Sequence, residues 1–436
     1  MGPNENASPE GPAPPCPPSV THWMVALAGF CGFAVALAIL LAIRPFSDTV
    51  NSVFFLLLGL AGSIFAVDLV WEKVHKRPAT GLDFAQWRPS PLRAFVKFVG
   101  LIGSVGFVAA LYALFPEYSG DFYARYFDAA KVALPVGLAL SIPYIYWIDG
   151  FMVSPEDGLW HAGMAALLRF KRINPAELRQ HLLGWLVKGY FLPLMFIYMC
   201  RDFDDLFVRG IPPLNSFKAV YDYSFDSLYF VDVCFAAAGY IFSLRLTDTH
   251  LRSAESTALG WLAALICYEP FWSLIGAQYL AYESGRPWGE WLNDDPALFD
   301  FWGILILSLV AVYVWATVMF GCRFSNLTNR GIITNGPYRF TKHPAYIAKN
   351  LSWWLISVPF LGDDGWQALR RTALLLLLNG VYALRAWTEE RHLSQDPTYV
   401  AYVRWMESNG LFRFLRPARA AGTNPASPRV MGESGD

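Results

Sequence analysis

Charged residues are scarce in this chain. They make up 16% of its 436 residues, whereas soluble domains usually carry about 25%. The formal net charge is −1, so no strong field would attract nucleic acid, and we expect no nucleic-acid partner. Hydrophobic residues make up 55% of the chain and gather in long runs. This composition is typical of a protein that is embedded in a lipid bilayer.

Sequence motifs for metals and for soluble cofactors are also absent. The six cysteines show no CxxC or Cys/His spacing, so we expect no metal site, and most of them lie within apolar runs as small hydrophobic residues. The sequence has no GxGxxG after a strand, no P-loop lysine motif, no HExxH and no GxSxG. None of the common soluble nucleotide-binding or hydrolase sites is therefore expected.

The two ends of the chain differ from the rest in composition. Residues 1–22 are rich in Pro and Gly and lack Lys and Arg. They cannot bury a core, so we predict a disordered N-terminal tail. They also lack the basic region that begins a usual signal peptide. Residues 417–436 are predicted to form a disordered C-terminal tail for the same compositional reason.

Long apolar runs occupy most of the chain between these tails. A helix needs roughly 20 apolar residues to cross about 30 Å of hydrocarbon. Because backbone polar groups in lipid must be paired within the segment, such runs form helices. We therefore predict an all-α, polytopic transmembrane helical bundle of about ten spans. The predicted spans run near 23–43, 52–71, 94–115, 130–152, 182–201, 226–246, 256–282, 299–322, 345–361 and 370–388.

The basic residues are distributed unequally between the two sides of this bundle. With the N-terminus placed in the cytoplasm, the loops and ends on that side hold 21 Lys and Arg, and those on the other side hold 8. The positive-inside rule then predicts that both termini and the loop 323–344 are cytoplasmic. We expect a multi-pass protein of a bacterial inner membrane with its active site on the cytoplasmic side.

Residues 323–361 depart from the pattern of a plain membrane span. They begin with a polar, basic loop in which Gly336 permits unusual backbone angles. Pro344 suits the first turn of the next helix, where its missing N–H costs nothing. His343 then lies at the helix N-terminus, beside free N–H groups that favour a carboxylate or a phosphate. We call Lys342, His343 and Pro344 the KHP corner.

The two spans after this corner form a hairpin, which returns the chain to the same membrane face. Glu389 and Glu390, the twin glutamates, stand where the chain re-enters the cytoplasm. We therefore predict that the hairpin brings the twin glutamates close to the KHP corner. Arg385 lies one turn before Glu389, where it can form a salt bridge.

These motifs resemble the isoprenylcysteine carboxyl methyltransferase family and its phospholipid N-methyltransferase relatives. The family pattern is a G-x-Y-x-x-x-R-H-P-x-Y loop, a membrane hairpin, then E-E-x-x-L and a tyrosine-bearing C-terminal helix. The resemblance covers residues 299–416, and lysine replaces the usual arginine at Lys342, which keeps the charge but loses bidentate geometry. The matching residues are Gly336, Tyr338, Lys342, His343, Pro344, Tyr346, Glu389, Glu390 and Leu393, followed by Tyr399 and Tyr402.

The resemblance implies methyl transfer from S-adenosylmethionine to a lipid or lipid-linked acceptor, which presents a carboxylate, amine or hydroxyl at the cytoplasmic membrane face. Tyrosine faces suit the sulfonium, a glutamate suits the amino group or ribose hydroxyls, and basic groups suit the cofactor carboxylate. The candidate catalytic residues are Lys342, His343, Glu390 and Arg339. The candidate cofactor-binding residues are Tyr338, His343, Pro344, Tyr346, Glu389, Glu390, Tyr399 and Tyr402.

Residues 23–298, a predicted seven-span region, fall outside the resemblance, and two other functions remain open. One is a membrane reductase that uses NADPH, similar to ten-span sterol reductases, although their G-W-W-G and R-H-x-N-Y elements are absent. Its phosphate ligands would be Arg323, Arg330, Arg339 and Lys342. The other is a transporter that uses the intramembrane charges Lys188, Asp232 and Glu269, for which we favour structural pairing across helices.

Overall fold

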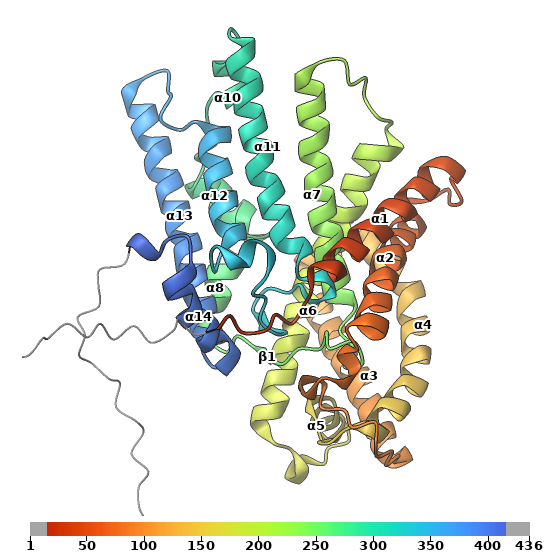
Figure 1. Cartoon of the computed structure of the whole chain (residues 1–436). Coiled ribbons are helices and arrows are strands. Elements are labelled where there is room, and N and C mark those ends of the chain that lie inside the picture. The colour runs from red at the N-terminus through yellow and green to blue at the C-terminus, as the bar shows by residue number, and fades with distance from the viewer. Residues whose placement is uncertain (1–14, 416–436) are drawn as a thin grey trace, which may run out of the picture.

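A computed structural model describes residues 15–415, and the predicted tail 417–436 lies outside these residues. The described chain is nearly all helical, as predicted (Figure 1). The first helices are α1 (Trp23–Ile43), α2 (Thr49–Ala66), α3 (Pro91–Leu114), α4 (Asp121–Phe151), α5 (Gly158–Ala166), α6 (Pro175–Phe203) and α7 (Phe217–Ile241). The later helices are α8 (Ala258–Leu265), α9 (Ala277–Tyr279), α10 (Trp288–Trp291), α11 (Pro296–Val318), α12 (Pro344–Ser357), α13 (Gly365–Leu393) and α14 (Pro397–Asn409). Two short strands, β1 (Ser253–Ala254) and β2 (Thr328–Asn329), pair antiparallel.

Six of the described helical segments are long and apolar enough to cross a membrane. They are α1, α2 continued by the π-helical turn η1 (Val67–Trp71), α3, α4, α6 continued by η6 (Asp204–Val208), and α11. Each coincides with a predicted span. Helices α7, α12 and α13 also lie at predicted spans but are shorter or more polar. The chain is therefore a polytopic helical membrane protein, and the number of ten spans remains a prediction.

The predicted span 256–282 is wrong as a single helix. It is divided into α8, the π-helical turn η7 (Trp272–Gly276) and α9. Pro270 lies at the break, since proline lacks the N–H that a continuous helix needs there. Figure 1 nevertheless places β1 low in the bundle and α10 at its upper end. The broken segment therefore still carries the chain from the level of β1 to the level of α10 in this view.

Short polar side chains cap most of the long helices. Ser90, Asp157 and Asp364 each accept a hydrogen bond from a backbone N–H in the first turn of their helices, which satisfies a donor that has no partner within the helix. Helix α12 differs, because His343 occupies its N-cap and makes no capping hydrogen bond. The imidazole of His343 is thus left to other contacts.

Glycines allow two helix pairs to pack at very short range. A Cβ on Gly32 of α1 would lie 2.4 Å from the carbonyl oxygen of Gly59 in α2. A Cβ on Gly100 of α3 would lie 2.1 Å from the carbonyl oxygen of Leu159 in α5. Close backbone approach of this kind drives helix association in lipid, where the hydrophobic effect is lost.

Arg323 joins the end of α11 to two distant segments. Its side chain is buried, with 1% exposed. The guanidinium donates to Asp68 Oδ2 at 3.1 Å in η1, and to the carbonyl oxygens of Thr247 at 3.0 Å and Asp248 at 3.2 Å. A buried cation is stable only when it is paired and hydrogen-bonded. These contacts therefore fix where the chain leaves α11.

Arg330 joins the loop after β2 to the end of α7. Its guanidinium donates to the carbonyl oxygens of Gly239 at 2.6 Å, Phe324 at 2.9 Å and Phe242 at 3.2 Å. It also donates through Nε to the carbonyl oxygen of Thr249 at 2.8 Å. A cation is favourable at a helix C-terminus, where carbonyl groups lack partners within the helix. Arg330 thus caps α7 with a side chain from the loop that precedes the KHP corner.

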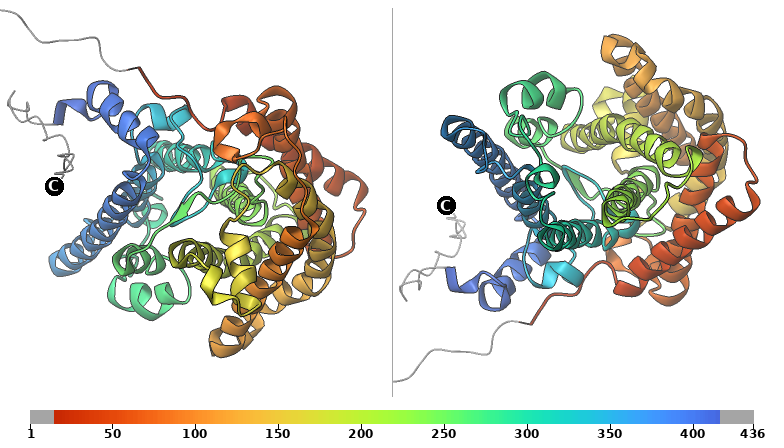
Figure 2. Two further views of the ribbon diagram at one scale, coloured as in Figure 1. Left: turned by 90° about the horizontal axis from the view of Figure 1, so that it is seen from below. Right: turned by 90° about the horizontal axis from the view of Figure 1, so that it is seen from above.

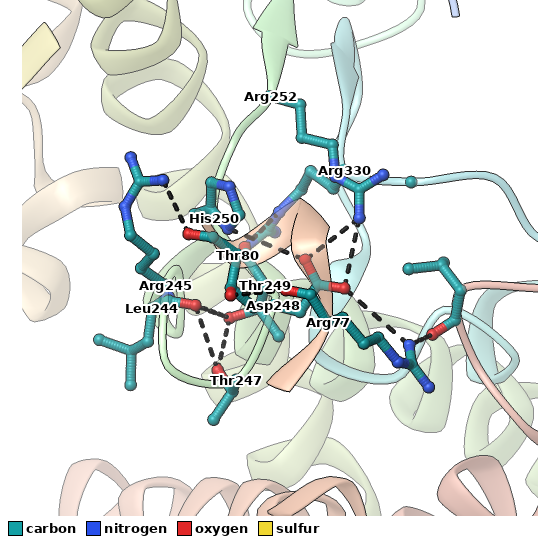
Figure 3. A network of polar contacts seen from close by, with 12 residues as sticks. Arg77, Thr80, Leu244, Arg245, Thr247, Asp248, Thr249, His250, Arg252 and Arg330 are labelled. Carbon is teal, nitrogen blue, oxygen red and sulfur yellow. Dashed lines mark hydrogen bonds and ion pairs between the residues drawn. The ribbon is translucent and has the colours of Figure 1, made fainter. Parts of the chain in front are cut away.

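Asp248 is the centre of the polar network beside these arginines. Its fully buried carboxylate lies 3.1 Å from Arg252 Nη2, 3.9 Å from Arg77 Nη1 and 4.0 Å from His250 Nδ1, and Figure 3 shows these side chains converging on it. Burial, followed by the charge of Arg245 and other neighbouring guanidiniums, lowers the pKa of His250 to about 3. His250 is therefore neutral near pH 7 while the carboxylate is neutralised by arginines.

The prediction of a disordered tail at residues 1–22 is wrong for its last residues. Residues 1–14 of this segment lie outside the described residues. Val20 donates its N–H to the carbonyl oxygen of Ile332 at 2.9 Å. Thr334 Oγ1 donates to the carbonyl oxygen of Pro17 at 2.9 Å. The segment pairs with residues of the later loop, a long-range contact that composition does not reveal.

We predict that Arg330→Met lowers the stability of the folded protein. Several buried carbonyl oxygens would lose their donor, and each such loss costs about 1–3 kcal/mol. Thermal unfolding of the protein in detergent should show a melting temperature well below that of wild type. Arg209→Met, at an exposed ion pair with Asp205, is the control and should change little. Equal melting temperatures for the two variants would contradict the structural role of Arg330.

Candidate active site

The loop before α12 has a fixed shape. Gly336 adopts a φ of 57°, in the left-handed region that favours glycine, and starts the 3-10 turn η9 (Gly336–Arg339). The hydroxyl of Tyr402 in α14 donates to the carbonyl oxygens of Tyr338 at 2.6 Å and Thr341 at 3.4 Å. Helix α14 thereby holds the loop that leads into the KHP corner.

The hairpin of α12 and α13 brings the KHP corner to the twin glutamates, as predicted. Lys342 Nζ lies 2.5 Å from Glu390 Oε2, and His343 Nε2 lies 2.8 Å from Glu390 Oε1. One carboxylate thus uses both of its oxygens to hold two neighbouring side chains of the corner. Such charge-assisted contacts are stronger than neutral hydrogen bonds.

This double contact changes the acidity of Glu390, which lies beyond the predicted span 370–388. Burial alone would raise the pKa of its carboxyl group. The hydrogen bonds from His343 and Lys342, and the charge of Lys342, outweigh that effect and lower the pKa of Glu390 to about 2. Glu390 is therefore an anion throughout the physiological pH range.

Glu389 faces a different neighbour. Its Oε2 accepts a hydrogen bond from the hydroxyl of Tyr346 at 2.7 Å. The Tyr346 ring stacks on the imidazole of His343, with centroids 5.4 Å apart and planes 4° from parallel. Both glutamates therefore contact α12 or its cap, and the histidine lies between a carboxylate and an aromatic face.

Arg385 lies in an aromatic enclosure rather than in the predicted salt bridge with Glu389. Its guanidinium carbon lies 5.1 Å from the ring centroid of Tyr346, 5.4 Å from that of Tyr268 and 5.8 Å from that of Tyr382. Its Nη2 donates to Asn326 Oδ1 at 2.6 Å. The cation is thus stabilised by ring faces, the Asn326 amide and the Tyr268 hydroxyl 3.5 Å from its Nη2, which is a favourable arrangement when desolvated.

A cavity connects these groups. It is lined by Tyr338, Lys342, His343, Tyr346 and Glu389 among the predicted site residues. Several lining residues lie outside the motifs, and sequence reasoning missed them; they are Glu255, Gly260, Ala264, Tyr268, Tyr313, Asn326, Lys349, Tyr382 and His392. Neither Glu255 nor Tyr268 belongs to a motif, and no local signal in the sequence marks them.

Glu255 is the least expected of these lining residues. It is 3% exposed and comes from the loop before α8. Its Oε1 accepts hydrogen bonds from the N–H of Thr257 at 2.8 Å and its hydroxyl at 2.6 Å, and lies 3.4 Å from Arg391 Nη2. Its Oε2 lies 4.0 Å from His392 Nδ1. Glu255 thus ties the region before α8 to the end of α13 beside the twin glutamates.

Other predicted site residues do not line the cavity. Arg339 is exposed and does not line the cavity, and Pro344 is buried at the first turn of α12. Glu390 lies behind Lys342 and His343, while Tyr399 and Tyr402 are buried in the α14 cluster with Trp405, Met406 and Ile332. Tyr402 acts on the loop through its hydrogen bonds to carbonyl groups. Glu390 and Tyr402 therefore support the corner through their hydrogen bonds rather than line the cavity.

The predicted pairing of Lys188, Asp232 and Glu269 is wrong. The ammonium of Lys188 lies 5.8 Å from the ring centroid of Trp185. Asp232 accepts a hydrogen bond from Tyr313, and Glu269 accepts two from Ser273 in the next turn. Each intramembrane charge has a separate partner, so these three residues form no continuous polar path.

We predict that Glu390→Gln removes an acid-sensitive part of the stability. The pKa of Glu390 in the folded state, about 2, lies below its ordinary value of 4.5. Its contribution is therefore complete above pH 4.5 and is lost as the pH falls toward 2. Near pH 7 the variant should be less stable by up to ~3 kcal/mol. This difference should shrink below pH 4.5 when thermal unfolding in detergent is followed against pH.

The control for this pH series is Glu117→Gln, at an exposed position in the turn after α3. It should follow wild type at every pH. A constant gap between Glu390→Gln and wild type from pH 7 to 3 would contradict the assigned ion pairs.

Comparison with known proteins bears on this region of the chain. No curated protein and no solved structure matches the chain. A family model does match residues 302–395, which extend from α11 to the end of α13 and contain the KHP corner and the twin glutamates. That model describes the isoprenylcysteine carboxyl methyltransferase (ICMT) family, so the predicted resemblance is confirmed for this part of the chain and indicates a membrane methyltransferase.

Proposed function

We propose that this chain is an integral membrane methyltransferase that uses S-adenosylmethionine and acts on a lipid or lipid-linked acceptor at the cytoplasmic face. The observation that carries the proposal is the contact of the KHP corner with the twin glutamates beside one cavity. Members of the matched family in general depend on S-adenosylmethionine. This cofactor, when bound, supplies an activated methyl group on a sulfonium.

The groups that line the cavity suit such a cofactor. Lys342 and His343 can bind its carboxylate, and Glu389 can accept a hydrogen bond from its amino group or ribose hydroxyls. Tyr346 can hold Glu389 in place through its hydroxyl. The tyrosine faces predicted for the sulfonium are partly used already, because Tyr346 lies between His343 and Arg385. The donor set therefore fits the amino-acid end of the cofactor best.

The role of the protein in such a reaction is mainly alignment. A displacement at a methyl group requires the acceptor in line with the bond that breaks, and good alignment alone supplies a large part of the rate. A carboxylate acceptor needs no base, whereas an amine or phenol would need one. His343 is the candidate for this task, since it lines the cavity and contacts Glu390. Burial of the cavity walls would exclude water from the acceptor.

The reductase alternative loses support from the contacts of its proposed phosphate ligands. Arg323 is committed to Asp68 and two carbonyl oxygens, and Arg330 is committed to the end of α7. Neither lines the cavity. Lys342 alone among those four basic residues lies on its surface.

We predict that the purified protein transfers labelled methyl groups from S-adenosylmethionine to a lipid or lipoprotein fraction of membrane extract. His343→Ala should reduce the transfer by at least ~100-fold, because both the corner and the cofactor contact are lost. A thermal shift with S-adenosylmethionine and none with NADPH should accompany the transfer. Unlabelled lipid fractions together with a thermal shift by NADPH alone would overturn the proposal.

We further predict that Tyr346→Phe weakens cofactor binding while the fold is kept. The variant loses the hydrogen bond that orients Glu389, so half-saturation should need roughly tenfold more S-adenosylmethionine. Tyr279→Phe, at a tyrosine that is 70% exposed on α9, is the matched control and should behave as wild type. If both variants bind the cofactor equally, Glu389 is not a cofactor ligand.

A further inference from the structure

The cavity extends along α12 away from the KHP corner, and its far end has a polar group of its own. Tyr313 and Thr317 of α11 and Lys349 of α12 line this part. Lys349 follows His343 by six residues, which is about 9 Å along a helix axis. Because the corner marks the start of α12, Lys349 lies deeper in the helical bundle than the proposed cofactor groups.

The ammonium of Lys349 rests on aromatic rings rather than in a salt bridge. Its ammonium nitrogen lies 5.1 Å from the ring centroid of Tyr313 and 5.5 Å from that of Trp353. Its ammonium makes no hydrogen bond or ion pair with another residue in the part of the chain that the structure describes. Ring faces stabilise a cation only partly. A charged group among membrane helices is costly unless it is paired.

Each of the other basic groups on the cavity wall has a hydrogen-bond or ion-pair partner. Lys342 and His343 contact Glu390, and Arg385 donates to Asn326 inside its tyrosine enclosure. His392 contacts the hydroxyl of Ser253 at 3.2 Å. Within residues 15–415, Lys349 thus differs from Lys342 and Arg385 on the cavity wall in that its ammonium makes no hydrogen bond or ion pair.

Asp232 fixes the aromatic ring on which the Lys349 ammonium rests. The Tyr313 hydroxyl donates to Asp232 Oδ2 at 2.5 Å, which fixes the ring on which the ammonium rests. Asp232 comes from α7, outside the family match, is 7% exposed, and its Oδ1 has no hydrogen-bond partner among the described residues. The carboxylate therefore fixes the tyrosine ring beside Lys349 and attracts the ammonium by its charge, without forming a direct salt bridge with it.

We propose that Lys349 binds an anionic group of the methyl acceptor and that Asp232 and Tyr313 are its positioning residues. The acceptor would then be an amphiphile whose head carries a carboxylate or a phosphate. That the bound molecule is a methyl acceptor rests on the proposed function. The binding of an anionic amphiphile can be measured without any cofactor. It assigns part of the substrate site to α7, a helix of the region before the family match.

The test uses three single-chain amphiphiles with the full chain in neutral detergent. Labelled myristate is displaced by unlabelled myristate, by tetradecyl phosphate and by the neutral myristamide. Wild type should bind at least one of the anionic probes about tenfold more tightly than the amide, which is the usual effect of one charge-assisted contact. Which anion binds more tightly distinguishes a carboxylate head from a phosphate head.

Three variants locate the effect. Lys349→Met should lose the preference for anions and keep the affinity for the amide, while Lys349→Arg should retain the preference. Tyr313→Phe should reduce it, because the ring loses its bond to Asp232. Lys131→Met, at an exposed ion pair on α4, is the control and should bind all probes as wild type does. If Lys349→Met does not fold, Lys349→Gln takes its place.

Three results would overturn the inference. They are equal binding of anions and amide by wild type, an anion preference that survives in Lys349→Met, and a thermal shift with S-adenosylmethionine that Lys349→Met loses in parallel. The last result would assign Lys349 to the cofactor carboxylate. Failure of the proposed function would give a different result. Wild type would then show neither methyl transfer nor a thermal shift with S-adenosylmethionine, whether or not it binds the amphiphiles.

Discussion

Two buried guanidinium groups hold the site region against the rest of the bundle. Arg323 and Arg330 flank β2, and their donors reach η1, the end of α7 and the loop around Asp248. Burial makes these contacts obligatory, because an unpaired guanidinium in this environment would cost several kcal/mol (~3–5 by analogy with broken buried pairs). The loop that leads to the KHP corner can therefore take few positions. In both views of Figure 2 the last helices, in blue, lie on one side of the bundle and the first helices, in red, lie on the other, with the middle of the chain between them.

The cavity belongs to both parts of the chain as a result. Its end at the KHP corner is built mostly from α12 and α13, yet Glu255 and Tyr268 reach the cavity from the segment around α8. At its deeper end, α7 acts through Asp232 on the α11 side chain that faces Lys349. The helices before the family match thus provide part of the cavity wall and also fix the charges within it.

The sequence predicted what depends on local pattern and missed what depends on distant partners. Apolar runs located most helices, but 256–282 was taken as one span because hydropathy hides the effect of Pro270. The corner and the twin glutamates could be matched because a hairpin fixes their geometry. Arg385 was assigned to Glu389 by helical spacing, whereas its partner, Asn326, lies 59 residues away in the chain. Nothing in the periodicity of a helix reveals a contact of that range.

Glu390 already occupies the anion-binding groups of the KHP corner, Lys342 and His343. Any external carboxylate that binds Lys342 and His343 must displace this side chain or share their donors with it. Affinity at the corner is then a difference between two similar ion pairs rather than the full strength of one. Small inorganic anions would gain almost nothing by such an exchange. A ligand that also contacts other walls of the cavity would gain enough to displace Glu390. The presence of Glu390 would therefore favour ligands that are large enough to fill the cavity.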